Sequence, residues 1–203
     1  MNKRLILITL GILLIIHFAT AQEFNSGVYG GITVSQLDGD TFSGYNKAGI
    51  VGGAFVNRYM SKKMGWQLGI RYISKGSKHA DSEAGEYYKS VLQYIESPIT
   101  ARYFIRKDID LEGGLALGYL MKSLEDTDGN GLLEPKPPFN KFELSGLAGI
   151  NYHWNKQFSF GAFFSYSLTP ARPYSSGYSV PMDRGQYNNV IYFAFCYTIS
   201  SWK

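Results

Sequence analysis

Two long alternating runs, joined at Asn155-Lys156, place the strongest constraint on what this chain can fold into. Apolar residues occupy every second position of Phe142–Trp154 and again of Phe158–Leu168, with mostly small or polar residues between them. Side chains alternate between the two faces of a strand, so each run predicts a strand with one apolar face. Strands of soluble domains mostly span about five or six residues, and both runs are longer. The bulky face is aromatic and the opposite face is small, which favours a barrel whose apolar face meets lipid.

The same alternation recurs along the chain and predicts six further strands. We expect them over Val28–Leu37, Lys47–Arg58, Met64–Gly76, Val91–Phe104, Ile109–Met121 and Asn189–Trp202. The facing of Lys47–Arg58 stays open, because both parities carry apolar and small residues. Pro98 removes a ladder donor, and we expect a local bulge there.

The connections between these strands alternate long and short. The long ones, expected as loops, include Ser77–Ser90, Lys122–Asn140 and Thr169–Asn188. Bacterial outer-membrane barrels combine short periplasmic turns with longer external loops. The sequence therefore predicts an all-β fold, an eight-stranded antiparallel transmembrane up-and-down β-barrel, with both termini on the periplasmic side.

The first 21 residues have the features of a cleavable signal peptide. Lys3 and Arg4 form a positive start, Leu5–Phe18 is apolar, and Ala19-Thr20-Ala21 fits a cleavage site. We expect a signal peptide over 1–21, a barrel domain over 22–203, and delivery to the cell outer membrane. No later apolar run is long enough for a membrane helix, so insertion must use strands.

Charge and cysteine content exclude some classes of partner and bond. The formal net charge is +4, and removal of Lys3 and Arg4 leaves 18 basic and 16 acidic residues, or +2. So weak and scattered a charge predicts no nucleic-acid partner. The single cysteine, Cys196, allows no intramolecular disulfide, and we interpret it as a small buried strand residue.

Five charged residues fall on the parity that should face the lumen. They are Arg71, Glu96, Arg102, Glu112 and Glu143. An eight-stranded barrel is just wide enough for side chains to fill, and an unpaired charge in low dielectric costs several kcal/mol. We interpret the set as a structural ion-pair network, with a proton or ion path as the alternative. Within it, Glu96 is expected to pair with Arg71 or Arg102.

Aromatic residues gather beside the predicted short turns and near the C-terminus, as an interfacial girdle would require. The set comprises Trp66, Tyr103, Tyr152, Trp154, Phe158 and Trp202, with Tyr59 and Phe104 also beside short turns.

Metal binding and catalysis find little support. Asp126–Gly131 matches the start of a calcium loop, but Pro137 stands where the bidentate Glu is needed, which favours a solvated turn over a bound ion. The mature chain has two histidines, His79 and His153, predicted at opposite ends of the barrel, and no Asp/His cluster stands out. We therefore expect no enzyme activity and no cofactor.

Several segments resemble the PorT-like outer-membrane β-barrel proteins of Gram-negative bacteria. The most specific is Tyr94-Ile95-Glu96-Ser97-Pro98, similar to the family's L-x-Y-L-E-I-P pattern, with Ser97 in place of an aliphatic residue. Generic barrel stretches such as LEGGLALGYLM and FSFGAFFSYSLTP accompany it. The resemblance implies an eight-stranded outer-membrane barrel and says little about activity.

The expected function is non-enzymatic and depends on structure or on partner binding. Outer-membrane lipid is one expected partner, and proteins bound through external loops or periplasmic turns are others, with a secretion assembly suggested by the family name. Tyr with Ser and Gly in the long loops suits adaptable binding. Two alternatives stay open. One is a membrane-embedded enzyme acting on lipid or peptide, and the other is a soluble lipocalin-type barrel whose Phe158/Phe160/Phe164 parity would face inward around a ligand.

Overall fold

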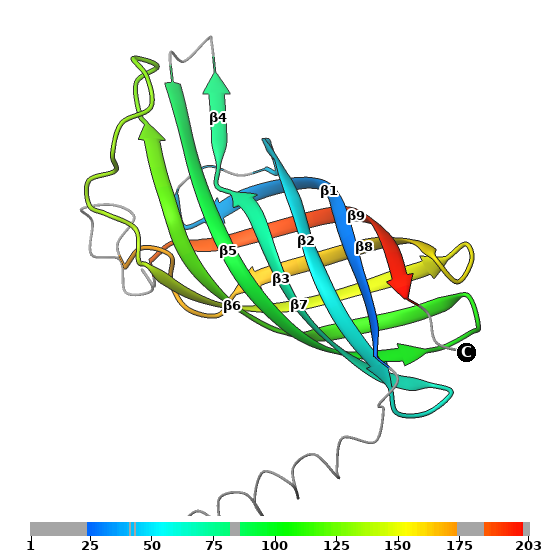
Figure 1. Cartoon of the computed structure of the whole chain (residues 1–203). Helices are drawn as coiled ribbons and strands as arrows, with labels where there is room; N and C mark the ends of the chain where they lie inside the picture. The colour runs from blue at the N-terminus through cyan, green and yellow to red at the C-terminus, as the bar shows by residue number, and fades with distance from the viewer. Residues whose placement is uncertain (1–23, 41, 43, 82–85, 174–184, 201–203) are drawn as a thin grey trace, which may run out of the picture.

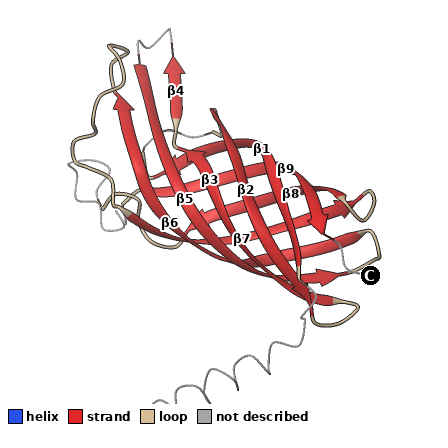
Figure 2. Cartoon of the chain, viewed as in Figure 1, coloured by secondary structure: helices blue, strands red, loops and turns tan. Residues whose placement is uncertain are grey.

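The computed structural model describes residues 24–40, 42, 44–81, 86–173 and 185–200, and within them the chain forms nine strands (Figures 1 and 2). In chain order these are β1 (Asn25–Asp38), β2 (Lys47–Tyr59), β3 (Met64–Lys75), β4 (Lys78–Asp81), β5 (Glu86–Phe104), β6 (Ile109–Asp126), β7 (Phe142–His153), β8 (Phe158–Ser167) and β9 (Tyr187–Ser200). The predicted signal peptide lies outside the described residues. No helix among the described residues is both long and apolar enough to cross a bilayer.

The strands close into an eight-stranded antiparallel barrel, as predicted. Neighbours along the chain pair with one another, β1 also pairs with β9, and β3 pairs with β5. The short β4 is not a ninth stave. It continues β3 in one register along β5, since Lys75 lies opposite Leu92 and Lys78 lies opposite Lys89. A break at Gly76, whose φ is 131°, separates the two pieces.

The segment expected as a loop at Ser77–Ser90 is largely β-structure, which corrects the sequence prediction. β5 begins at Glu86 and β6 runs on to Asp126, so both are longer than expected. With β4 they project beyond the other strands as a three-stranded extension of the barrel wall (Figure 1). We call the extension Lys78–Asp81, Glu86–Ser90 and Lys122–Asp126. At the other end lie the short turns 60–63, 105–108 and 154–157.

The aromatic and aliphatic parity faces outward. Phe160 and Phe164 are 48% and 45% exposed, and their polar neighbours Ser159 and Ser165 are buried. Other outward side chains include Ile32, Ile50, Ile70, Ile99, Leu117 and Phe195, each at least half exposed. An inward aromatic parity, as the lipocalin-type alternative requires, is therefore wrong. β2 resolves with Val51, Phe55 and Asn57 inward.

The bulge predicted at Pro98 lies elsewhere. Pro98 stays in register opposite Ala116, and the register shift falls at Gln93/Tyr94, where Met121 is the extra residue of β6. On the β3 side the pairing is interrupted between Leu68–Ile99 and Arg71–Glu96, because proline offers no N–H. The Ser97 hydroxyl donates to the Gly69 carbonyl at 3.2 Å and so supplies a donor beside the gap. Ser97, the departure from the PorT-like pattern, thus has a local role.

Candidate functional site

Four buried charges form one cluster in the half of the lumen nearer the long loops. Arg71 contacts Glu96 through Nε at 2.7 Å, and Lys75 Nζ lies 2.6 Å from a carboxylate oxygen of both Glu96 and Glu143. The four side chains come from β3, β5 and β7 and are almost fully buried. Two cations thus face two anions, and the cluster is neutral. Glu96 pairs with Arg71, one of the two partners expected, and not with Arg102.

Polar and aromatic neighbours enclose this cluster. Arg71 donates to the Tyr192 hydroxyl, Ser145 and Asn188 both donate to Glu143, and Lys75 Nζ lies 4.9 Å from the centroid of the Tyr94 ring. Apolar side chains at the same level, all buried, are Ile73, Leu92, Leu120 and Val190. We call this filled section the plug. It leaves no room for a wide diffusion path at this level of the described lumen.

A second charged cluster lies at the short-turn end. Arg102 makes a two-pronged contact with Asp110, with Nη2 to Oδ2 at 2.6 Å and Nε to Oδ1 at 3.1 Å. His153 Nε2 lies 2.5 Å from Asp110 and 3.2 Å from Arg102. The expectation that no Asp/His cluster exists was therefore wrong. Because Arg102 and Asp110 both contact Nε2, this nitrogen is not poised on a nucleophile as a catalytic base would be.

Amides and a hydroxyl complete this second cluster. Gln67 and Thr100 donate to Glu112 at 3.2 and 2.8 Å, and Asn151 donates to both Asp110 and Glu112. Glu112 is 3.9 Å from Arg102, at the limit of an ion pair. This cluster forms a polar ring on the lumen wall.

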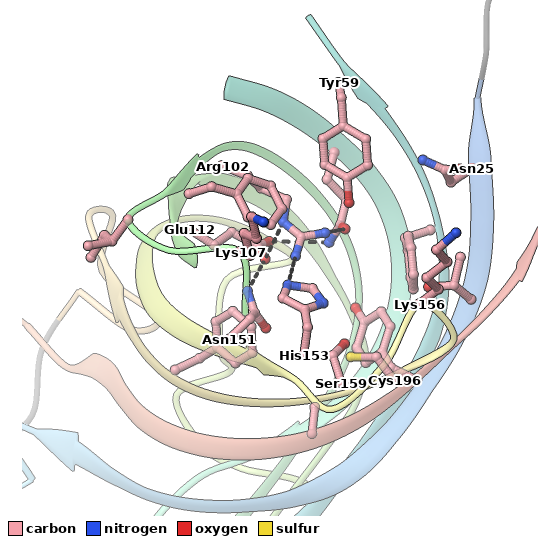
Figure 3. Close-up of a pocket in the computed structure, with 18 of the residues that line it drawn as sticks. Asn25, Tyr59, Arg102, Lys107, Glu112, Asn151, His153, Lys156, Ser159 and Cys196 are labelled. Atoms are coloured by element: carbon pink, nitrogen blue, oxygen red, sulfur yellow. Dashed lines mark hydrogen bonds and ion pairs between the residues drawn. The ribbon is translucent and has the colours of Figure 1, made fainter. Parts of the chain in front are cut away.

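The polar ring lines a cavity of about 920 Å³ that reaches from the short turns up to Arg71 and Tyr192 (Figure 3). Arg102, Asn151 and His153 converge on one side, with Ser159 and Cys196 on the neighbouring strands. Below the ring the lining residues belong to the three short turns, and beyond it to the inward faces of the strands. The lumen is therefore plugged toward the long loops and hollow toward the short turns.

A third buried group fixes the external end. Arg172 binds Glu125 with both terminal nitrogens, at 2.8 and 3.1 Å, and its guanidinium carbon lies 4.3 Å from the centroid of the Phe139 ring. Tyr88 donates to the same carboxylate at 2.7 Å. One arginine thus joins the extension to the segments that follow β6 and β8.

The loop between β1 and β2 also packs on the extension. Phe42 stacks on His79 and Tyr88, with ring centroids 4.4 and 5.3 Å apart. Asp40 accepts the Phe42 N–H at 3.0 Å, and burial raises the pKa of this carboxyl above its ordinary value. The extension is therefore supported on one side by this loop and on another by Arg172.

The predicted girdle residues take outward or rim positions, with two exceptions. Tyr103, Tyr152 and Trp154 are exposed, and Trp66 and Phe158 are half-buried on the outer wall. Tyr59 and Phe104 line the cavity mouth instead. Trp202 lies outside the described residues.

The candidate calcium loop is a turn centred on Asp126. Its carboxylate accepts the N–H groups of Gly129 at 2.8 Å and Gly131 at 3.2 Å, so backbone donors already occupy both oxygens. Asn130 donates to Asp128. Within the described ranges, no group of three His, Cys, Asp or Glu side chains is arranged to hold a metal ion.

All five predicted lumen charges point inward, but sequence reasoning missed three of their partners. Lys75, Asp110 and His153 complete the two clusters. Lys75 lies four residues after Arg71 on the same parity, and Asp110 lies two residues before Glu112, so the alternation itself contained the signal.

The chain was compared with known proteins and structures. A comparison with curated protein sequences gave no match. Among solved structures, the attachment invasion locus protein Ail of Yersinia pestis is 14% identical with a TM-score of 0.53, over 88% of this chain and 99% of that one. Neisserial surface protein A is 11% identical with a TM-score of 0.54, over 86% and 97%. At such identities the likeness shows the fold alone. The outer membrane protein beta-barrel domain family matches residues 20–171, about three quarters of the sequence, and the chain belongs to that family.

Proposed function

We propose that the protein is a non-enzymatic outer-membrane barrel that binds a partner outside the cell through its β4–β5–β6 extension. The observation that supports this most is the extension itself. β5 and β6 continue as paired strands past the barrel wall, and β4 adds a third strand to them. Loops that only connect strands need no such order, whereas ordered β-structure held rigidly above a membrane offers a preformed surface.

The packing beneath the extension supports a fixed surface. Arg172 and Glu125 are buried and joined by two hydrogen bonds, and Phe42 packs on the other side. Ordering is therefore already present before a partner arrives, which lowers the entropic cost of binding. Ail, a structure with the same fold, is described as an attachment protein and was crystallised with the heparin analogue sucrose octasulfate. Attachment is the class of role that we extend to this chain.

β4 offers a specific mode of contact. Among the described strands it pairs with β5 alone, so its other side is an edge that an extended peptide could lengthen. Ala80 in this strand is exposed. The alternatives of a lipid- or peptide-modifying enzyme draw no support from His153, whose Nε2 is engaged by Asp110 and Arg102.

A narrower hypothesis follows from the resemblance to PorT-like proteins. The segment Tyr94–Pro98 supports it, and it would make the barrel an accessory of a secretion assembly. Such a partner would act from the periplasm and would contact the short turns rather than the extension.

One cross-linking experiment separates these proposals. A photoreactive benzoylphenylalanine is placed at Ala80 in the extension or at Ile105 in a short turn, both exposed, in barrels expressed in cells. We expect a discrete cross-linked product from Ala80 on incubation with the surfaces or cells that the bacterium meets. A product from Ile105 alone would favour the secretion accessory. Heat-dependent gel mobility of each variant confirms that the barrel has folded.

A further inference from the structure

We propose that the cavity at the short-turn end binds a single-chain amphiphilic anion, such as an alkyl carboxylate, sulfate or phosphate. Its volume of about 920 Å³ is within the range of small-molecule sites. The proposal does not depend on the external extension, because the plug separates the two ends of the lumen.

The mouth of the cavity is strongly cationic. The three short turns carry five basic residues and a single acid, Asp108, which lies 3.6 Å from one of the five. All five basic residues line the cavity: Lys62, Lys63, Arg106, Lys107 and Lys156. A ring of one sign around a low-dielectric opening attracts ions of the opposite sign. The head of the ligand is therefore an anion.

The deeper chamber is apolar and aromatic. Its walls include Phe55, Leu147, Phe163, Tyr192 and Ala194, all of them inward and buried by their neighbours. The rings of Phe163 and Tyr192 stack with centroids 4.7 Å apart, and Tyr29 adds a further ring. Such walls suit a hydrocarbon chain or an aromatic body rather than a second charge.

The polar ring between mouth and chamber decides the orientation. Arg102 is matched by Asp110, and Glu112 already accepts hydrogen bonds from Gln67, Thr100 and Asn151. These groups satisfy one another, so the positive charge left in excess is at the mouth. The ligand would lie with its head among the turn lysines and its body in the chamber. The Arg71–Glu96 pair closes the far end, which makes this a binding pocket and not a passage.

Two sources could supply this chemistry. A free amphiphile could enter from the periplasm, or an anionic phospholipid of the inner leaflet could insert one chain. Lysines at a membrane surface attract anionic headgroups in any case. The experiment therefore includes bilayers with and without anionic lipid.

Cys196 provides the reporter, because it is the sole cysteine of the chain and lines the chamber (Figure 3). The folded full-length mature barrel is placed in nanodiscs of zwitterionic lipid, and its labelling is timed with an anionic and a cationic methanethiosulfonate. We expect the anionic reagent to react at least about tenfold faster, as electrostatic focusing produces. Octanoate should slow labelling by a similar factor, and octylammonium should not. Slower labelling in nanodiscs with anionic phospholipid, without octanoate, would identify lipid as the source.

Matched variants separate the mouth from general charge. Lys62→Gln/Lys107→Gln/Lys156→Gln should remove the preference for the anionic reagent and the protection by octanoate. Lys122→Gln/Lys136→Gln/Lys141→Gln, three exposed lysines at the opposite end, makes the same charge change and should leave both intact. Heat-dependent gel mobility verifies that each variant has folded.

Three results would overturn the proposal. They are equal rates for the two reagents in the native barrel, equal protection by octylammonium, and equal behaviour of the two triple variants. If Cys196 reacts with neither reagent, calorimetric titration of octanoate decides, with saturable binding expected in the native barrel and loss of it in the mouth variant. No saturable heat in the native barrel would also overturn the proposal.

Discussion

At the scale of single residues, the plug shows how a narrow lumen holds charge. Arg71, Lys75, Glu96 and Glu143 are nearly fully buried, and each contacts at least one opposite charge of the set. Glu96 is the residue on which both cations converge. Its removal therefore affects two partners, which makes it the most informative position in the barrel.

We predict that Glu96→Gln destabilises the barrel by about 3–5 kcal/mol, the usual cost of removing one partner from a buried ion pair. The substitution leaves two cations facing one carboxylate, Glu143, in a section without room for bulk water. Urea unfolding in lipid vesicles, followed by gel mobility, measures the change.

A double variant tests the electrostatic explanation. Arg71→Met/Glu96→Met removes one ion of each sign and leaves Lys75 paired with Glu143. Replacement of a whole buried pair by apolar residues is often neutral, so the double variant should be more stable than Glu96→Gln. If the double variant is the less stable, packing and not charge balance governs this section.

The same residues show what the sequence could reveal about the site. Parity placed Arg71, Glu96, Arg102, Glu112 and Glu143 in the lumen, because one misplaced residue would turn a whole strand inside out. Lys75 and Asp110 follow the same parity and were within reach of that reasoning. The pairing of Arg102 with Asp110, rather than with Glu96, depends on strand stagger, which alternation does not encode.

At the scale of strands, prediction succeeded where lipid imposes a pattern and failed beyond it. The outward face must be apolar only within the bilayer, so the eight staves were visible in the sequence. The extension meets water on its exposed sides and carries Lys78, Lys89 and Lys122 among its residues. Without alternating hydrophobicity it was indistinguishable from a charged loop. The bulge at Met121 was equally invisible, because one extra residue leaves no mark in composition.

Gly76 is the hinge on which the extension depends. Its φ of 131° favours glycine, and a side chain there would collide with the carbonyl of Ser90 on β5. We predict that Gly76→Ala detaches β4 while the barrel stays closed, since left-handed strain of about 1–3 kcal/mol falls on this junction alone. Limited proteolysis of intact cells should then cut near 78–90.

Gly30→Ala provides the matched control. Gly30 lies in β1, and an added methyl group there meets open space. This variant should show the native proteolytic pattern. Native resistance in Gly76→Ala as well would mean that β4 does not need the left-handed turn.

At the scale of the whole molecule, the barrel is asymmetric along its axis. The end with long connections is plugged and capped by an ordered extension, and the end with short turns is hollow and ringed by lysines and arginines. Alternating apolar strands account for the wall, which is why the fold was predictable. The distribution of filled and empty lumen results from the packing of specific side chains such as Tyr94 and Tyr192, and could not be inferred from their parity.

The plug leads to a prediction about transport. We expect no steady porin-like conductance from the native barrel in a planar bilayer, because the plug residues leave no continuous water path at their level. A general porin serves as the positive control. Lys75→Ala/Glu143→Ala removes two long side chains as a neutral pair and leaves Arg71 bound to Glu96, so this variant should conduct in brief openings. Steady openings of the native barrel would show that the plug moves aside in the membrane, and the pocket at the short-turn end would then have to be regarded as the vestibule of a channel.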